Sequence, residues 1–196
     1  MCHQVLRDAR FHHLLFLIDA DLARSAGGRG CSRCGCRLHR ASYPRKPRGL
    51  PEEETEEAIR RHSFCCSGRD CRKRLTPPSV RFLDRRVYLG VVVVLAVALT
   101  QGVSGRRART LRREIGVDRR TLGRWREWWQ KEVPRSDYWA ELRGRLDRPP
   151  DPAALPASLL ERIEGCDEEQ RLVRLLSLLG PLSHSPPMRA RFARVA

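Results

Sequence analysis

The N-terminal part of the chain alternates apolar and polar positions with the spacing of an α-helix. Between residues 4 and 25 apolar side chains recur every three or four positions, and charged side chains lie between them. This spacing predicts an amphipathic helix within residues 1–28, ended by the glycines of 27–30. We expect the helix to pack against the segment that follows or against a second subunit. The apolar positions are Leu6, Phe11, Leu14, Leu15, Ile18 and Leu22.

A run of thirteen uncharged residues, Val87 to Leu99, forms the centre of segment 82–101. A membrane-spanning helix needs roughly 20 apolar residues. Because Arg86 and Arg106 flank the run, we expect no membrane span. The β-branched side chains favour a strand, whereas the length and the helical pattern that follows favour a buried helix. We predict the buried helix.

Residues 108–127 have the spacing of two short helices joined by a tight turn. Gly116 lies where the turn needs a residue without a side chain, Val117 fills the turn, and Asp118 can cap the second helix. The pattern predicts a helix-turn-helix within a helical domain at 82–135. The inward-facing positions are Leu111, Ile115, Val117, Leu122 and Trp125.

The last part of the chain, residues 136–196, has a helical apolar pattern interrupted by prolines. This pattern predicts a helical tail that serves as an interaction segment. Its apolar positions are Leu159, Leu160, Ile163, Leu172, Leu175, Leu176, Leu178 and Leu179.

The positive charge is concentrated in particular segments. The chain carries a formal net charge of +16, with +7 in residues 29–50, +5 in 65–86 and +7 in 102–135, while each of the other segments sums to zero or less. Such local excess points to a polyanionic partner, first of all a nucleic acid. Only three of the 39 basic residues are lysine. Arginine suits phosphates and guanine edges, although a GC-rich genome also favours it.

Two cysteine pairs have the spacing of a tetrahedral metal site. Cys31 and Cys34 form a C-x2-C pair followed by glycine, and Cys66 and Cys71 form a C-x4-C pair. Zn²⁺ in structural sites takes four ligands from two short turns and leaves no position for a reactive water. We therefore predict a structural Zn²⁺ held by these four thiolates.

The ligand set has alternatives within the same cluster. By spacing alone, Cys36 can replace Cys34, and Cys65 can replace Cys66. We prefer Cys66 because Phe64, two residues earlier on a predicted strand, then shares one side of that strand with the sulfur. The remaining candidate ligands are His39 and His62.

The metal-binding segment is expected to be a zinc-ribbon-like module at 29–81 with an inserted loop at 40–62, where prolines and an acidic run interrupt the pattern. The expected fold class is mainly α, a helix-turn-helix bundle, with this small zinc-ribbon-like β module. Eight cysteines and no convincing secretory signal favour a reducing, intracellular setting. The expected localisation is the cytoplasm of a bacterium, in association with the nucleoid.

Basic side chains of residues 102–135 are the candidate nucleic-acid contacts. A recognition helix presents its N-terminal residues to base edges in the major groove, while other basic residues neutralise phosphates. The predicted base contacts are Arg119, Arg120, Thr121 and Arg124. The predicted phosphate contacts are Arg106, Arg107, Arg109, Arg112, Arg113 and Arg126.

Together, the two motifs resemble the N-terminal DNA-binding region of insertion-sequence transposases. The likeness rests on C-x2-C-G, an aromatic residue before C-x4-C-R, and I-G-V-x-x-x-T-L-x-R-W, and it covers about residues 31–132. It implies zinc on the four cysteines and contacts from Thr121, Arg124 and their neighbours to the terminal repeats of a mobile element. The long insertion between the cysteine pairs departs from the compact ribbon of that family.

The expected function is sequence-specific binding of double-stranded DNA as a transposase-related accessory or regulatory factor. We expect no enzymatic activity, because nothing after Pro134 has the alternating strands and helices of a transposase catalytic domain. A homodimer or a transposase partner is expected to bind through the N-terminal helix or the C-terminal tail. The alternative is an RNA- or ribosome-associated zinc-binding protein.

Overall fold

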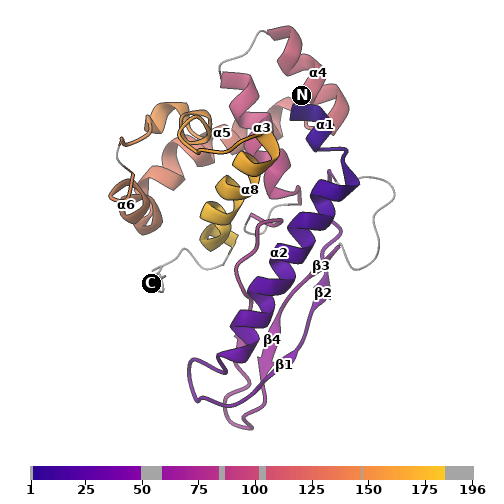
Figure 1. Cartoon of the computed structure of the whole chain (residues 1–196), viewed down its shortest axis with the longest axis vertical. Helices are drawn as coiled ribbons and strands as arrows, with labels where there is room; N and C mark the ends of the chain where they lie inside the picture. The colour runs from indigo at the N-terminus through magenta and orange to yellow at the C-terminus, as the bar shows by residue number, and fades with distance from the viewer. Residues whose placement is uncertain (1, 50–58, 84–86, 102–104, 147, 184–196) are drawn as a thin grey trace.

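The computed structural model describes residues 2–49, 59–83, 87–101, 105–146 and 148–183. It is mainly α-helical with a small antiparallel β module, as the apolar spacing predicts. Figure 1 shows a helical body at one end of the long axis and a narrower lobe of strands at the other, with α2 running from one to the other. The α-helices are α1 (Cys2–Val5), α2 (Ala9–Gly28), α3 (Gly90–Gln101), α4 (Gly105–Ile115), α5 (Arg119–Glu127), α6 (Asp137–Arg143), α7 (Ala157–Leu160) and α8 (Glu168–Leu179). Shorter helical turns are η1 (Trp128–Glu132), η2 (Val133–Arg135), η3 (Pro152–Ala154) and η4 (Gly180–Ser183).

The lobe contains two small antiparallel sheets. Three strands, β1 (Leu38–Arg40), β4 (Phe64–Cys66) and β5 (Arg74–Leu75), pair in the order β1-β4-β5. The other two, β2 (Tyr43–Pro44) and β3 (Arg60–Arg61), pair with each other. Their pairing differs from the loop expected at 40–62, because the ends of this insertion hydrogen-bond to each other and extend the sheet region. Residues 50–58 lie outside the described part of the chain.

Helix α2 is the amphipathic helix expected within residues 1–28. Asp8 caps it by accepting a hydrogen bond from the Arg10 amide at 2.9 Å. Phe11 and Leu15 are buried in the core of the helical body, while Ala23 is buried against Phe64 of the lobe. Of the two expected packing partners, the described structure therefore shows the segment that follows.

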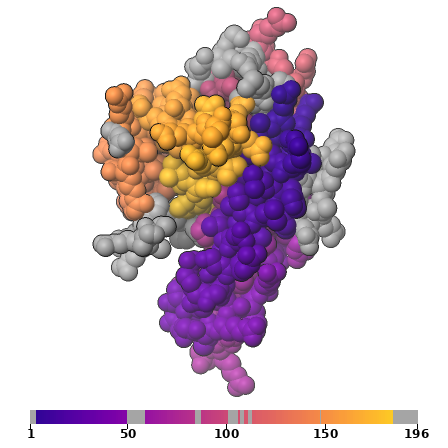
Figure 2. Space-filling view, viewed as in Figure 1, coloured from indigo at the N-terminus to yellow at the C-terminus, as the bar shows by residue number. Residues whose placement is uncertain are grey.

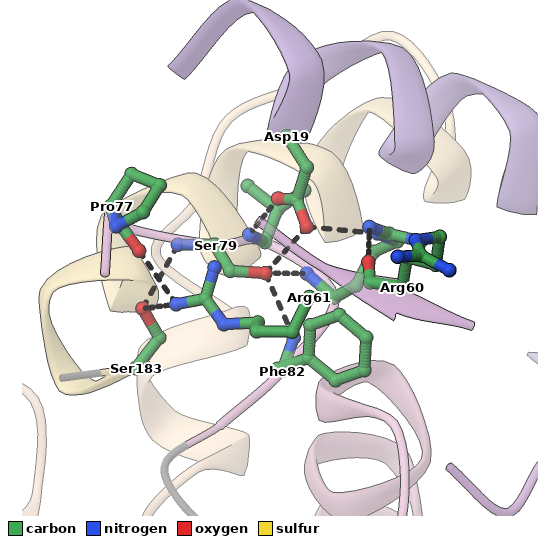
Figure 3. A network of polar contacts seen from close by, with 9 residues as sticks. Asp19, Arg60, Arg61, Pro77, Ser79, Phe82 and Ser183 are labelled. Atoms are coloured by element: carbon green, nitrogen blue, oxygen red, sulfur yellow. Dashed lines mark hydrogen bonds and ion pairs between the residues drawn. The ribbon is translucent and has the colours of Figure 1, made fainter. Parts of the chain in front are cut away.

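A buried polar network joins α2 to the segment before α3 (Figure 3). Asp19 was expected between the apolar positions of α2, but the structure buries it completely, because Arg81, Ser79 and the Val80 amide bind its carboxylate. Nearby, buried Arg61 donates to the Pro77 carbonyl at 2.6 Å. Burial, partly offset by the Asp19 charge, lowers the pKa of Arg61 to about 10.

Helix α3 forms the centre of the helical body. Every residue from Val91 to Ala98 is buried, so most of the apolar run is a buried helix and the strand alternative is wrong. The first residues of the run, 87–89, precede the helix, and Val87 is 60% exposed. Helices α4, α5, α7 and α8 pack against it. Within the described residues, no helix has the length and apolar character that crossing a membrane requires.

The C-terminal helices complete this core. Of the expected apolar positions in α8, Leu172, Leu175, Leu176 and Leu179 are buried, and Leu178 is partly buried against the same core. Figure 1 shows α8 beside α3, and the Leu176 side chain lies close to Gly90 at the start of α3. The apolar face of this helix is thus covered by the chain's own core.

Candidate metal centre and basic helical pair

Four cysteine sulfurs gather at the end of the lobe that lies beyond the C-terminus of α2. The Sγ atoms of Cys31, Cys34, Cys66 and Cys71 all lie within 4.8 Å of one another. The separation is 3.4 Å between Cys34 and Cys66 and 3.7 Å between Cys31 and Cys71. Four thiolates around Zn²⁺, each at about 2.3 Å, would lie about 3.8 Å apart. The geometry fits one tetrahedral metal ion, and the four residues are those preferred from the sequence.

Two backbone turns support the sulfurs. In the first, the Cys31 amide donates to the Cys36 carbonyl at 2.9 Å and the Gly35 amide donates to the Cys31 carbonyl at 2.8 Å. Gly35 has a φ of 71°, which an L side chain rarely adopts. In the second turn, the Gly68 amide donates to the Cys66 sulfur at 3.3 Å. Amide donors of this kind stabilise thiolates and orient metal ligands.

The cluster also separates the proton affinities of its thiols. Hydrogen bonds from the Arg33 and Cys34 amides lower the pKa of Cys31 to about 6. The Gly68 amide lowers the pKa of Cys66, but burial and the neighbouring thiols outweigh it and raise that pKa to about 12. A bound cation would favour deprotonation of all four thiols, because cysteine binds a metal as the thiolate.

The alternative ligands lie outside the set of four. Cys65 is on the opposite side of β4 from Cys66, and its thiol faces the Arg72 carbonyl at 3.7 Å. Phe64 and Cys66 share the buried side of β4, as the strand alternation predicts. Cys36 is not in the group of sulfurs within 4.8 Å of one another. It is exposed, as Cys34 is, and a Cβ placed on Gly68 would lie 3.4 Å from the Cys36 sulfur and 3.5 Å from that of Cys34.

The two candidate histidines are also outside the cluster. His39 is exposed on β1, where it pairs in register with Cys65. The ring of His62 lies 6.3 Å from that of Phe16 on α2.

Helices α4 and α5 form a basic helical pair joined by residues 116–118. Gly116 has a φ of 63°, and Val117 is buried in the turn. Asp118 caps α5 by accepting a hydrogen bond from the Thr121 amide at 2.6 Å. This bond is the main reason that the pKa of Asp118 is lowered. The turn glycine, the filling residue and the cap are those expected from the sequence.

The predicted base contacts differ in exposure. Arg119 and Arg120 are exposed on the first turn of α5, and Arg124 is exposed in its last turn. Thr121 is only 7% exposed, and its hydroxyl donates to Asp118 at 3.1 Å while it accepts from Arg124 at 3.0 Å. The hydroxyl thus links the helix cap to the Arg124 guanidinium.

The predicted phosphate contacts fall into three groups. Arg106, Arg109 and Arg113 line, with Thr110, an open hollow of about 370 Å³ on α4. Arg126 donates to the Thr100 carbonyl at 2.9 Å and is tied to α3. The side chains of the two remaining arginines, Arg107 and Arg112, lie outside the described part of the structure.

Tyr88 connects the basic helical pair to the lobe, a role that its position inside an apolar run does not reveal. Its hydroxyl donates to the Gly116 carbonyl at 3.4 Å and accepts from Arg48 at 3.3 Å. Its ring packs edge-on against Trp125, with 5.0 Å between centroids. Tyr88 thereby contacts both the turn between α4 and α5, at Gly116, and α5 itself, at Trp125.

Comparisons with protein-family models, curated proteins and solved structures give no match.

Proposed function

We propose that this chain is a zinc-stabilised protein that binds double-stranded DNA in a sequence-specific manner, with α4 and α5 acting as a helix-turn-helix. The observation that carries the proposal is the N-terminal end of α5, where exposed Arg119 and Arg120 follow a side-chain-capped turn and exposed Arg124 lies further along the same helix. A helix end of this kind fits the major groove, where arginine pairs with guanine. The biological setting that we propose is an accessory or regulatory role linked to transposition.

The two helices would divide the work of binding. Arg119, Arg120 and Arg124 on α5 would reach base edges, and Thr121 would orient Arg124 through its hydrogen bond. The arginines that line the hollow on α4 would contact phosphates, because that hollow is open and rimmed by positive charge. This arrangement calls for no catalytic group, so we propose a binding protein and not an enzyme.

Zinc is the metal that we propose for the four-cysteine cluster. The donor set is all sulfur and the separations match a tetrahedral Zn²⁺ site. Bound there, zinc would supply folding free energy and hold two turns together. Cys31, Cys34, Cys66 and Cys71 would carry it.

Selection of bound duplexes from a random pool, followed by affinity measurements on the selected and on a scrambled duplex, tests this proposal. Arg124→Ala should weaken binding to the selected duplex more than to the scrambled one, whereas Arg113→Ala should weaken both equally. Equal losses on the two duplexes for both variants would contradict base reading by α5. Stronger binding to structured RNA than to any duplex at the same salt would favour the RNA-associated alternative.

A further inference from the structure

The metal-binding lobe is far more basic than a folded module requires. Its described residues, 29–49 and 59–75, contain thirteen lysines and arginines but a single acidic residue, Asp70. The basic side chains gather around the metal turns in particular. Arg33 lies between two ligands, and further basic residues flank the remaining cysteines. We call the following exposed set the lobe tip: Arg33, Arg37, Arg69, Arg72, Lys73 and Arg74.

None of the lobe-tip side chains forms an ion pair within the described chain, so their charges face solvent. Some of this charge balances the metal centre, because four thiolates around Zn²⁺ carry a net charge of about −2. The six basic residues of the tip exceed that charge and Asp70 combined by about three. The remaining positive charge is exposed and can bind a polyanion.

The lobe tip is separate from the basic helical pair. Figure 1 shows the strands of the lobe at one end of the long axis and α4 at the other. Figure 2 shows the lobe as a narrow projection below the helical body, with α2 along its side. A polyanion that contacts both basic surfaces must therefore extend along the molecule.

We infer that the lobe tip is a second binding surface for the phosphate backbone of the same DNA duplex, so that the protein holds DNA at two separate points. Duplex DNA suits this arrangement because it presents phosphates continuously and stays nearly straight over tens of base pairs. The metal turns hold the arginines on a rigid base, which reduces the entropy lost on binding. This inference rests on the proposed duplex binding by α4 and α5, but it concerns different residues.

The test removes charge at the tip and measures how binding depends on salt. The lobe variant carries Arg33→Gln, Arg72→Gln and Lys73→Gln in the full, zinc-loaded chain. Its control carries Arg143→Gln, Arg148→Gln and Arg162→Gln, which remove the same charge from exposed sites in the C-terminal helical region. On a duplex longer than the selected site, plots of log K against log salt should become less steep by roughly 2 to 3 for the lobe variant, because each phosphate that the protein no longer neutralises lowers the slope by about 0.9. The control should keep the wild-type slope and so isolate the position of the charge.

Zinc content measured on each variant distinguishes weaker phosphate binding from unfolding of the lobe. If the lobe variant binds no zinc, a second variant with Arg69→Gln, Lys73→Gln and Arg74→Gln, which leaves the turn between Cys31 and Cys34 untouched, replaces it. A wild-type slope in a zinc-loaded lobe variant would overturn the inference.

Duplex length separates this inference from the proposed function. A duplex just long enough for the selected site should bind the wild type and the lobe variant equally, and a longer duplex should bind the wild type more tightly. If the difference in affinity between the wild type and the lobe variant is the same on both duplexes, two-point binding is overturned. This holds even if Arg124→Ala relaxes sequence preference. Conversely, the lobe variant could lose duplex binding while Arg124→Ala and Arg113→Ala keep the wild-type affinity. That result would contradict the proposed base contacts of α5 and leave the lobe as the DNA-binding surface.

Discussion

Asp19 on α2 and Arg81, just before α3, form an ion pair of 2.8 Å whose side chains are 0% and 3% exposed. The Asp19 carboxylate also accepts hydrogen bonds from the Ser79 hydroxyl at 2.5 Å and the Val80 amide at 2.7 Å. Arg81 in turn donates to the Arg60 carbonyl of β3. The pair therefore holds together α2, the lobe and the start of the central core.

Asp19→Asn should lower the free energy of unfolding by about 3 to 5 kcal/mol, because it removes the charge of the buried carboxylate that pairs with Arg81. Urea unfolding followed by circular dichroism measures the change. Asp21→Asn is the matched control on the same helix. Its side chain is 68% exposed, so a change within about 0.5 kcal/mol is expected. Equal effects of the two substitutions would show that the buried pair contributes nothing specific.

His62 should make the fold sensitive to mild acid. Burial, reinforced by the Arg81 charge, lowers the pKa of His62 below its usual 6.5. As the pH falls through about 6.5, the unfolded chain takes up a proton that the folded chain resists, so stability declines. The wild type should therefore lose more unfolding free energy between about pH 7.5 and about pH 5 than His62→Phe does. Urea unfolding at the two pH values measures this difference.

An exposed histidine provides the control for that experiment. His39→Asn should keep the wild-type loss of stability on acidification, because the His39 side chain is exposed in the folded chain. Any protonation of the metal ligands is common to all three proteins and therefore does not affect the comparison. A His62→Phe variant whose stability falls as steeply as that of the wild type would rule out His62 as the cause.

Cys34 and Cys36 offer a direct test of the ligand assignment. Cys36→Ser should leave metal content and Co²⁺ absorption unchanged, whereas Cys34→Ser should lower the affinity for metal, since only Cys34 belongs to the set within 4.8 Å. Competition with a chromophoric chelator measures both. Because the Cys36 sulfur lies near the cluster, the double substitution should bind metal more weakly than Cys34→Ser alone. A larger loss of metal affinity in Cys36→Ser than in Cys34→Ser would show that Cys36, and not Cys34, is the metal ligand.

Local patterns in the sequence were sufficient for much of the candidate site. Alternation along a strand selected Cys66 over Cys65, and the residues of the turn before α5 have the roles that their types predict. Asp19 could not be found in this way. A carboxylate inside an apolar pattern reads as a solvent-facing position until its partner, 62 residues away in Arg81, is known. Tyr88 was hidden for the same reason, because its hydrogen bonds depend on distant segments.

Two glycines with open space around them should respond to alanine in opposite directions. Gly116 has a φ of 63° in the turn before α5, whereas Gly123 lies inside α5, and a Cβ at either would meet nothing within 4 Å. Gly116→Ala should destabilise by about 1 to 2 kcal/mol because of the left-handed backbone. Gly123→Ala should stabilise by about 1 kcal/mol because alanine favours the helix. Urea unfolding compares them, and Gly116→Asn should recover part of the loss; a neutral Gly116→Ala would contradict this turn geometry.

Tyr88→Phe tests whether the lobe and the basic helical pair are coupled. The substitution removes the hydroxyl bonds to Gly116 and Arg48 but keeps the ring against Trp125, so the cost in stability should be about 0.5 to 1.5 kcal/mol. If the hydroxyl positions the turn, affinity for the selected duplex should fall in Tyr88→Phe while zinc content stays at the wild-type level. Arg48→Met, which removes the guanidinium that donates to the hydroxyl and lies over the Tyr88 ring, should reproduce part of that fall. A loss of stability without any change in duplex affinity would limit Tyr88 to packing, since the turn would then keep its position without the hydroxyl.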